Sequence, residues 1–160
     1  MQKNNSGRQK ISTIYPSISP KFDLSNIFSL DGVLSSSNNS HMPDGVNAKI
    51  LVTNNSNPEI ALAGASLGAR LGFETSALTL PLTIDESQLF EENSLSTIFL
   101  LGRESPLFEK LFNSNIFSIP SLSDSEGLIR IIHGALPNTT IVLITGSNNK
   151  GIRAASDVLS

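Results

Sequence analysis

The sequence repeats one local pattern, in which a short apolar run leads through a polar loop into a capped helix. Residues 49–53 contain the continuous apolar run Ile50-Leu51-Val52, which is typical of a strand buried on both faces. Asn57 can cap the helix that follows, Pro58 suits the first helical position, and Glu59 favours the positive end of the helix dipole. Units of this kind bury their apolar faces when helices cover a sheet, so the pattern predicts an α/β fold.

The first helix is predicted from an apolar stripe at spacings of three and four residues: Ile60, Ala63, Leu67 and Leu71. Gly64 and Gly68 allow this helix to approach a sheet closely, and Gly72 is placed to end it.

Two further strands are predicted in the middle of the chain. Residues 78–84 alternate between apolar and polar side chains, and Pro81 favours a position at the sheet edge. Residues 97–101 form a second continuous apolar run. Ser105 as a cap and Pro106 in the first turn then begin a short helix, with the apolar side Leu107, Phe108, Leu111 and Phe112.

The last part of the chain predicts two adjacent strands and a closing helix. Residues 127–132 and 140–145 are mainly apolar and are predicted to be strands. The connection 134–138 is too short for a helical crossover, so the two strands should form an antiparallel pair. Residues 146–151 lead into a helix with the apolar side Ile152, Ala155 and Leu159.

The predicted architecture is an α/β domain over residues 48–160, in the order β-α-β-β-α-β-β-α. Its sheet has about five strands, is mixed but mainly parallel, and carries helices on its faces. Residues 1–47 are rich in Ser, Asn and Pro and are predicted to be a mostly irregular arm. Its apolar islands, such as Phe22, Leu24, Ile27 and Phe28, can still pack on the domain.

Composition limits the classes of protein. The 160 residues with 39% hydrophobic content suit one domain with one core. A net charge of -3 and 11 scattered Lys and Arg residues give no basic stripe, which argues against nucleic acid as a partner. The absence of cysteine excludes disulfides and thiolate metal sites. No apolar stretch reaches the length of a membrane span or signal peptide, so no membrane insertion is expected.

A ligand site is expected where the strands end. In open parallel sheets ligands bind beyond the carboxyl ends of the strands, so the loops 54–57, 102–105 and 146–151 should line one rim. Their backbone N–H groups and short polar side chains can receive an anion or sugar hydroxyls, although the same residues equally serve as helix caps and turns. The candidate ligand-binding residues are Asn54, Ser56, Gly102, Arg103, Gly146 and Ser147.

No catalytic residue, metal site or cofactor is predicted. Ser147 lies in a strand-to-helix elbow but lacks the G-x-S-x-G frame and an assignable base. His41 and His133 have no partner at a metal-ligand spacing. Gly146 and Gly151 match neither the dinucleotide fingerprint nor the phosphate-binding loop. A hydrolase centred on Ser147 remains only an alternative.

The remaining charged residues have simpler explanations. Arg103 can be a surface arginine or pair with Glu104 or Glu109. Asp31 and Asp44 bracket a Ser- and Asn-rich run that lacks the carboxylates of a calcium loop and is typical of a turn-rich linker. A solvated loop face explains the acidic residues Glu86, Glu91 and Glu92.

The C-terminal third contains residues 126–131, then 140–146, followed by Gly151, Ala154-Ala155 and Leu159. With these residues it resembles a small non-catalytic Rossmann- or flavodoxin-like domain. This pattern resembles the end of the accessory domain that precedes the barrel in hexosaminidase-like and α-glucuronidase-like glycoside hydrolases. It is also similar to the periplasmic modules of the bacterial cellulose synthase subunit. An aromatic residue is common in that family at the place of Ala154.

The resemblance implies a non-catalytic accessory or interaction domain of a larger, carbohydrate-related and extracytoplasmic protein. Its partner would be another domain of the same parent protein. Because the catalytic residues of those hydrolases belong to the barrel, none is carried over to this chain. The oligomeric state is not predicted.

Overall fold

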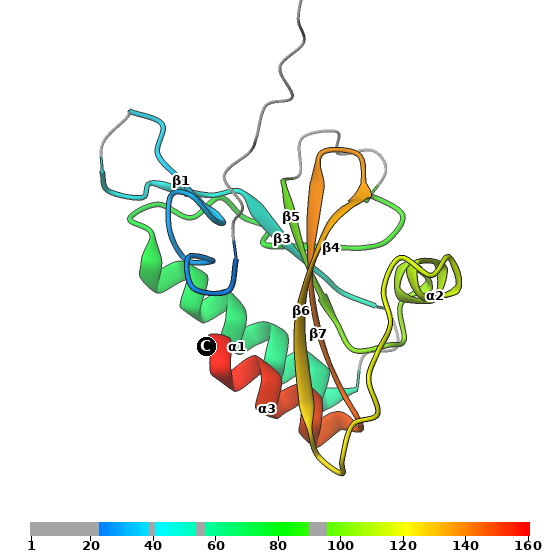
Figure 1. Cartoon of the computed structure of the whole chain (residues 1–160). Coiled ribbons are helices and arrows are strands. Elements are labelled where there is room, and N and C mark those ends of the chain that lie inside the picture. The colour runs from blue at the N-terminus through cyan, green and yellow to red at the C-terminus, as the bar shows by residue number, and fades with distance from the viewer. Residues whose placement is uncertain (1–22, 39–40, 54–56, 90–95) are drawn as a thin grey trace, which may run out of the picture.

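The computed structural model describes residues 23–38, 41–53, 57–89 and 96–160, and it confirms an α/β fold (Figure 1). Its main sheet is mixed and has five strands in the spatial order β4-β3-β5-β7-β6. Strands β4, β3, β5 and β7 run parallel, whereas the edge strand β6 runs antiparallel to β7. The strands are β3 (Ala48–Leu51), β4 (Thr83–Ile84), β5 (Thr97–Leu101), β6 (Gly127–Leu136) and β7 (Thr139–Gly146).

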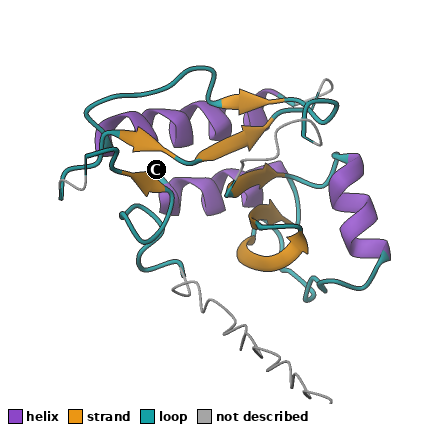
Figure 2. Ribbon diagram, turned by 90° about the horizontal axis from the view of Figure 1, so that it is seen from above, coloured by secondary structure: helices purple, strands orange, loops and turns teal. Residues whose placement is uncertain are grey.

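Helices cover both faces of this sheet. Helices α1 (Pro58–Glu74) and α3 (Asn149–Leu159) pack side by side on one face, and α2 (Pro106–Asn113) stands apart from them on the other (Figures 1 and 2). The sheet side chains divide between two buried clusters accordingly, with Phe99 and Val142 facing α1 and α3, and Leu100 and Leu143 facing α2. This alternation is the period-2 geometry of a strand.

Local signals in the sequence explain α1. Its buried residues are the predicted stripe of Ile60, Ala63, Leu67 and Leu71, and the side chain of Asn57 accepts a hydrogen bond from the Glu59 amide. A Cβ atom on Gly64 would lie 3.2 Å from Leu101, so this glycine keeps the helix close to the sheet. The predicted end at Gly72 is wrong, because the helix continues to Glu74 and Thr75 caps it.

The predicted strand over residues 78–84 is also wrong for most of its length. Only Thr83 and Ile84 pair with β3, and Leu80 is 73% exposed. The Leu82 carbonyl still accepts from the Ile50 amide, and the side chain of Lys49 donates to the Pro81 carbonyl. Because proline in a sheet is confined to strand starts, edges and bulges, the ladder begins only after Pro81, and the alternating residues before it stay outside the sheet.

The β6–β7 hairpin confirms the predicted antiparallel pair. Strand β6 extends beyond the predicted range to Leu136, with an irregularity in its register between His133 and Leu136. The turn is therefore shorter than predicted. Asn138 has a positive φ of 57°, a conformation that asparagine tolerates better than most residues.

The segment before β3 contributes to the core. It forms a small hairpin of β1 (Leu34–Ser35) and β2 (Gly45–Val46), which the sequence did not predict. Ile27, Val33 and Leu34 are buried in the same cluster as α1 and α3. The guanidinium of Arg70 on α1 also lies 5.2 Å from the centre of the Phe28 ring. The described part of the N-terminal segment is therefore packed against the domain.

The hydrogen bonds between Ser37 and Asp44, which lie between β1 and β2, are expected to be lost in acid. The carboxylate of Asp44 accepts hydrogen bonds from the amide and the hydroxyl of Ser37, and these bonds lower the Asp44 pKa below its ordinary value of 3.8. A lowered pKa means that the carboxylate stabilises the fold above pH 3.8 and that this contribution is lost as the pH falls through the lowered value. In an NMR titration, the Ser37 amide signal should move with a midpoint below 3.8. The Asp44→Asn variant should abolish this transition and Asp31→Asn should retain it, whereas a midpoint above 3.8 would contradict the assignment.

Candidate functional site

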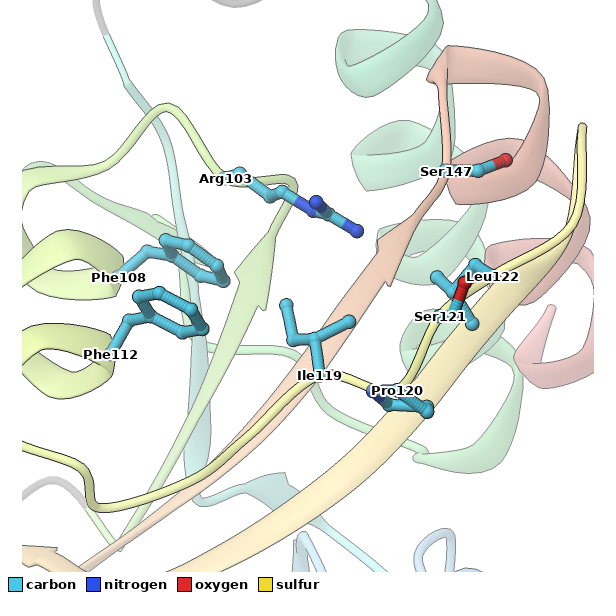
Figure 3. A pocket seen from close by; sticks show the side chains of 8 residues that line it. All are labelled: Arg103, Phe108, Phe112, Ile119, Pro120, Ser121, Leu122 and Ser147. Carbon is cyan, nitrogen blue, oxygen red and sulfur yellow. The ribbon is translucent and has the colours of Figure 1, made fainter.

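A cavity lies at the carboxyl ends of two neighbouring parallel strands. Leu101 of β5 is in register with Ile144 of β7, so the residues that follow both strands meet at one edge of the sheet. The structure brings Arg103 and Ser147 together on this cavity, as the rim geometry predicted (Figure 3). The cavity, called here the Arg103 pocket, has a volume of about 420 Å³ and is lined by Arg103, Phe108, Phe112, Ile119, Pro120, Ser121, Leu122 and Ser147.

Arg103 is positioned by a neutral partner. Its Nε donates a hydrogen bond of 3.1 Å to Oγ1 of Thr145, a residue that is fully buried in β7. The ion pairs between described residues are Arg70–Glu74 and Arg153–Asp157, so no pairing of Arg103 with an acidic residue is seen in this part of the chain. The outer end of the guanidinium extends over the pocket (Figure 3). The charge of Arg103 is therefore oriented, and no carboxylate of the described residues neutralises it.

Aromatic side chains form one wall of the pocket. The rings of Phe108 and Phe112 are nearly parallel, with centroids 5.9 Å apart. The ring of Phe117 contacts both rings edge-on, with centroid distances of 5.5 and 5.9 Å. Phe108 is buried, whereas Phe112 is 44% exposed, and both rings point towards the other side chains of the pocket (Figure 3). Helix α2 begins at the buried Ser105, whose Oγ accepts from the Phe108 amide and so fixes the helix that carries this wall.

The two candidate glycines have packing roles. Gly102 has a positive φ of 80°, and its amide donates to the Ile144 carbonyl at 2.8 Å. A Cβ atom on Gly146 would lie 2.5 Å from backbone atoms of Gly151 and Ile152 at the start of α3. Chain geometry thus accounts for glycine at both positions without a ligand.

The described residues do not assemble a nucleophile with its base at Ser147. The Ser147 amide donates to the Glu126 carbonyl, and the cap of α3 is Asn148, which accepts from the Gly151 amide. His133 lies on the distant hairpin, where its Nδ1 is 3.3 Å from Thr140 Oγ1. The hydrolase alternative therefore gains no support. The other two candidates, Asn54 and Ser56, lie outside the described residues.

An acidic cavity of about 360 Å³ lies at the ends of β3, β4 and β5, and its lining includes Thr53, Asp85, Glu86 and Glu104. The Asp85 carboxylate accepts from the Ser87 hydroxyl and the Gln88 amide, which lower its pKa. No three His, Asp or Glu side chains in the described ranges are grouped so as to hold a metal ion. Glu91 and Glu92 lie in the undescribed segment 90–95.

Comparison with known proteins adds no assignment. No family model matches the chain, and no curated protein is found to be similar. The resemblance to accessory domains of glycoside hydrolases and to cellulose synthase modules stays a prediction from the sequence. Of the helices in the described ranges, none has the length and apolar character of a membrane span.

Sequence reasoning missed most of the pocket. Thr145 was assigned only to a strand, and Phe112 only to the apolar side of a helix. The segment 119–122 reads as a Ser- and Pro-rich loop, and nothing in its pattern shows that it faces α2. The one signal in the sequence is the spacing of four residues between Phe108 and Phe112, which places both rings on the same face of α2.

Proposed function

We propose that this domain is a non-catalytic binding module whose ligand carries a negative charge. The observation that carries the proposal is Arg103, which a buried threonine orients over a cavity at the carboxyl ends of the strands. An arginine held through Nε keeps its outer N–H groups available as charge-assisted donors. The position also agrees with the usual location of ligands in open α/β sheets.

An anion suits this lining better than a neutral sugar. Among the described residues around the pocket, the polar side chains are one arginine and two serines, with no carboxylate or amide group to pair with several hydroxyls. A sugar would leave the arginine without a counter-charge. The absence of an acidic side chain from the lining also removes a competitor for the guanidinium.

The proposal is compatible with the accessory role that the resemblance implies. A module that recognises a charged group without transforming it can serve a larger extracytoplasmic, carbohydrate-related protein. Its partner would then be another domain of the same parent.

A direct test is NMR titration of ¹⁵N-labelled protein with acetate, phosphate and glucose at millimolar concentration. We expect the anions, and not glucose, to shift the amide signals of Gly102, Arg103 and Ser147. Arg103→Gln should weaken anion binding about tenfold, the effect of losing one charged hydrogen-bonding partner.

Arg153→Gln is the matched control, because it removes the same charge from an arginine paired with Asp157 on α3. Anion binding should be unchanged in this variant. Equal anion affinities in wild type and in Arg103→Gln would overturn the proposal.

A further inference from the structure

The charge of the pocket restricts the ligand to a small number of negative charges. Arg103 is the one charged side chain among the eight described residues that line it. The chain as a whole has a net charge of -3, so its overall field does not favour highly charged anions. A single guanidinium balances a singly charged group, whereas multiply charged phosphates are generally held by several cations or a nest of backbone amides.

The hydrogen bonding of Arg103 also limits which anionic group of a ligand can bind it. Because Nε is engaged with Thr145 Oγ1, the side-on face of the guanidinium that combines Nε with one Nη is taken. The free face is the end-on fork formed by the two Nη groups. This fork places two parallel donors opposite one planar acceptor group, and a carboxylate supplies the two matching oxygens.

The rest of the pocket is apolar on two sides. Phe108 and Phe112 form one wall with their rings inclined by only 8°. In Figure 3, Ile119, Pro120 and Leu122 lie across from these rings, with Arg103 at the upper side. A volume of about 420 Å³ accommodates a body the size of an aromatic ring, and small-molecule pockets generally combine apolar walls with few polar groups.

We propose that the Arg103 pocket takes a monocarboxylate attached to an apolar, ring-sized body. The carboxylate meets the Nη fork of Arg103, and the body lies between the Phe108–Phe112 wall and the 119–122 segment. This inference rests on the proposed function and specifies its ligand class. The same chemistry is present in a free aromatic acid and in the C-terminus of a peptide that ends in phenylalanine.

The test compares matched ligands by isothermal titration and NMR. The reference probe is 3-phenylpropionate. Removing the charge gives 3-phenylpropanamide, removing the body gives acetate, and phenyl phosphate changes the anion. We expect each of the three to bind about tenfold or more weakly than 3-phenylpropionate, since each lacks either the planar carboxylate or the buried ring.

Two variants separate the contributions of charge and body. Phe112→Ala should weaken 3-phenylpropionate and leave acetate unchanged, because the exposed ring of Phe112 contacts only the body. Arg103→Lys should weaken both acids, since an ammonium group cannot form the fork. A short peptide ending in Phe, with a free or an amidated C-terminus, distinguishes the two sources of the carboxylate.

The outcomes distinguish this inference from the proposed function. The assignment of a carboxylate with a ring is wrong if phenyl phosphate binds more tightly than 3-phenylpropionate, or if acetate binds as tightly. Anion binding that depends on Arg103 would still stand in either case. If no anion depends on Arg103, both proposals fail.

Discussion

Replacing Phe99 with alanine is expected to lower the free energy of unfolding by about 4 kcal/mol, within the range for loss of a buried phenyl group. Phe99 is fully buried on β5, between Ile50 of β3 and Val142 of β7 in register. Its ring lies in the cluster that joins the sheet to α1 and α3. Those neighbours belong to fixed strands and helices, so they cannot close over the cavity without distorting the sheet.

Chemical denaturation followed by circular dichroism measures this effect. Phe73 supplies the matched control, because it is the same residue type on α1 but is 88% exposed. Phe73→Ala should change the free energy of unfolding by no more than about 0.5 kcal/mol. A small domain has a total stability of about 5 to 15 kcal/mol, so Phe99→Ala removes a large share of it. Equal effects of the two substitutions would contradict the burial of Phe99.

Local sequence patterns were sufficient to predict the elements whose structure depends mainly on neighbouring residues. Residues 97–101 form β5 with the predicted bounds, because a continuous apolar run fits a strand covered on both faces. Ser105 and Asn57 cap the helices as predicted, since capping depends on neighbours within three residues. The antiparallel β6–β7 pair followed from the length of its connection alone.

The errors arose where structure depends on distant partners. Leu78 and Leu80 alternate with polar residues as in a strand, but both are exposed, and only Thr83 and Ile84 pair with the distant β3. That segment is rich in polar residues, and yet Val33 is fully buried because a hairpin places it against α1 and α3. Neither arrangement is encoded within a window of neighbouring residues.

The candidate site shows the same division. Topology predicted that the loops after β5 and β7 meet, because carboxyl ends of parallel strands share an edge, and Arg103 and Ser147 do line one pocket. The facing wall at 119–122 could not be predicted, since an irregular segment has no periodicity that reports which surface it covers. The role of Gly146 also differs from the expectation of a ligand contact, because its missing Cβ is what the approach of α3 requires.

Gly146→Ala is expected to destabilise the domain by about 3 kcal/mol, near the upper end for overpacking a rigid site. Its Cβ would lie 2.5 Å from the Gly151 carbonyl carbon and the Ile152 amide nitrogen, which are backbone atoms and cannot rotate away as a side chain does. Relief of this contact requires α3 to move off the end of β7, which exposes Ile152 and Ala155.

Gly72→Ala is the control for this substitution, because the added Cβ would have only an ordinary 3.9 Å contact with Leu78 on the exposed side of α1. Alanine is the better helix former, so this variant should gain about 0.5 to 1 kcal/mol in the same denaturation experiment. The same substitution of glycine by alanine is therefore expected to lower the free energy of unfolding at Gly146 and to raise it at Gly72. If Gly146→Ala keeps full stability and loses only anion binding, the glycine serves the ligand rather than the packing of α3 against the sheet.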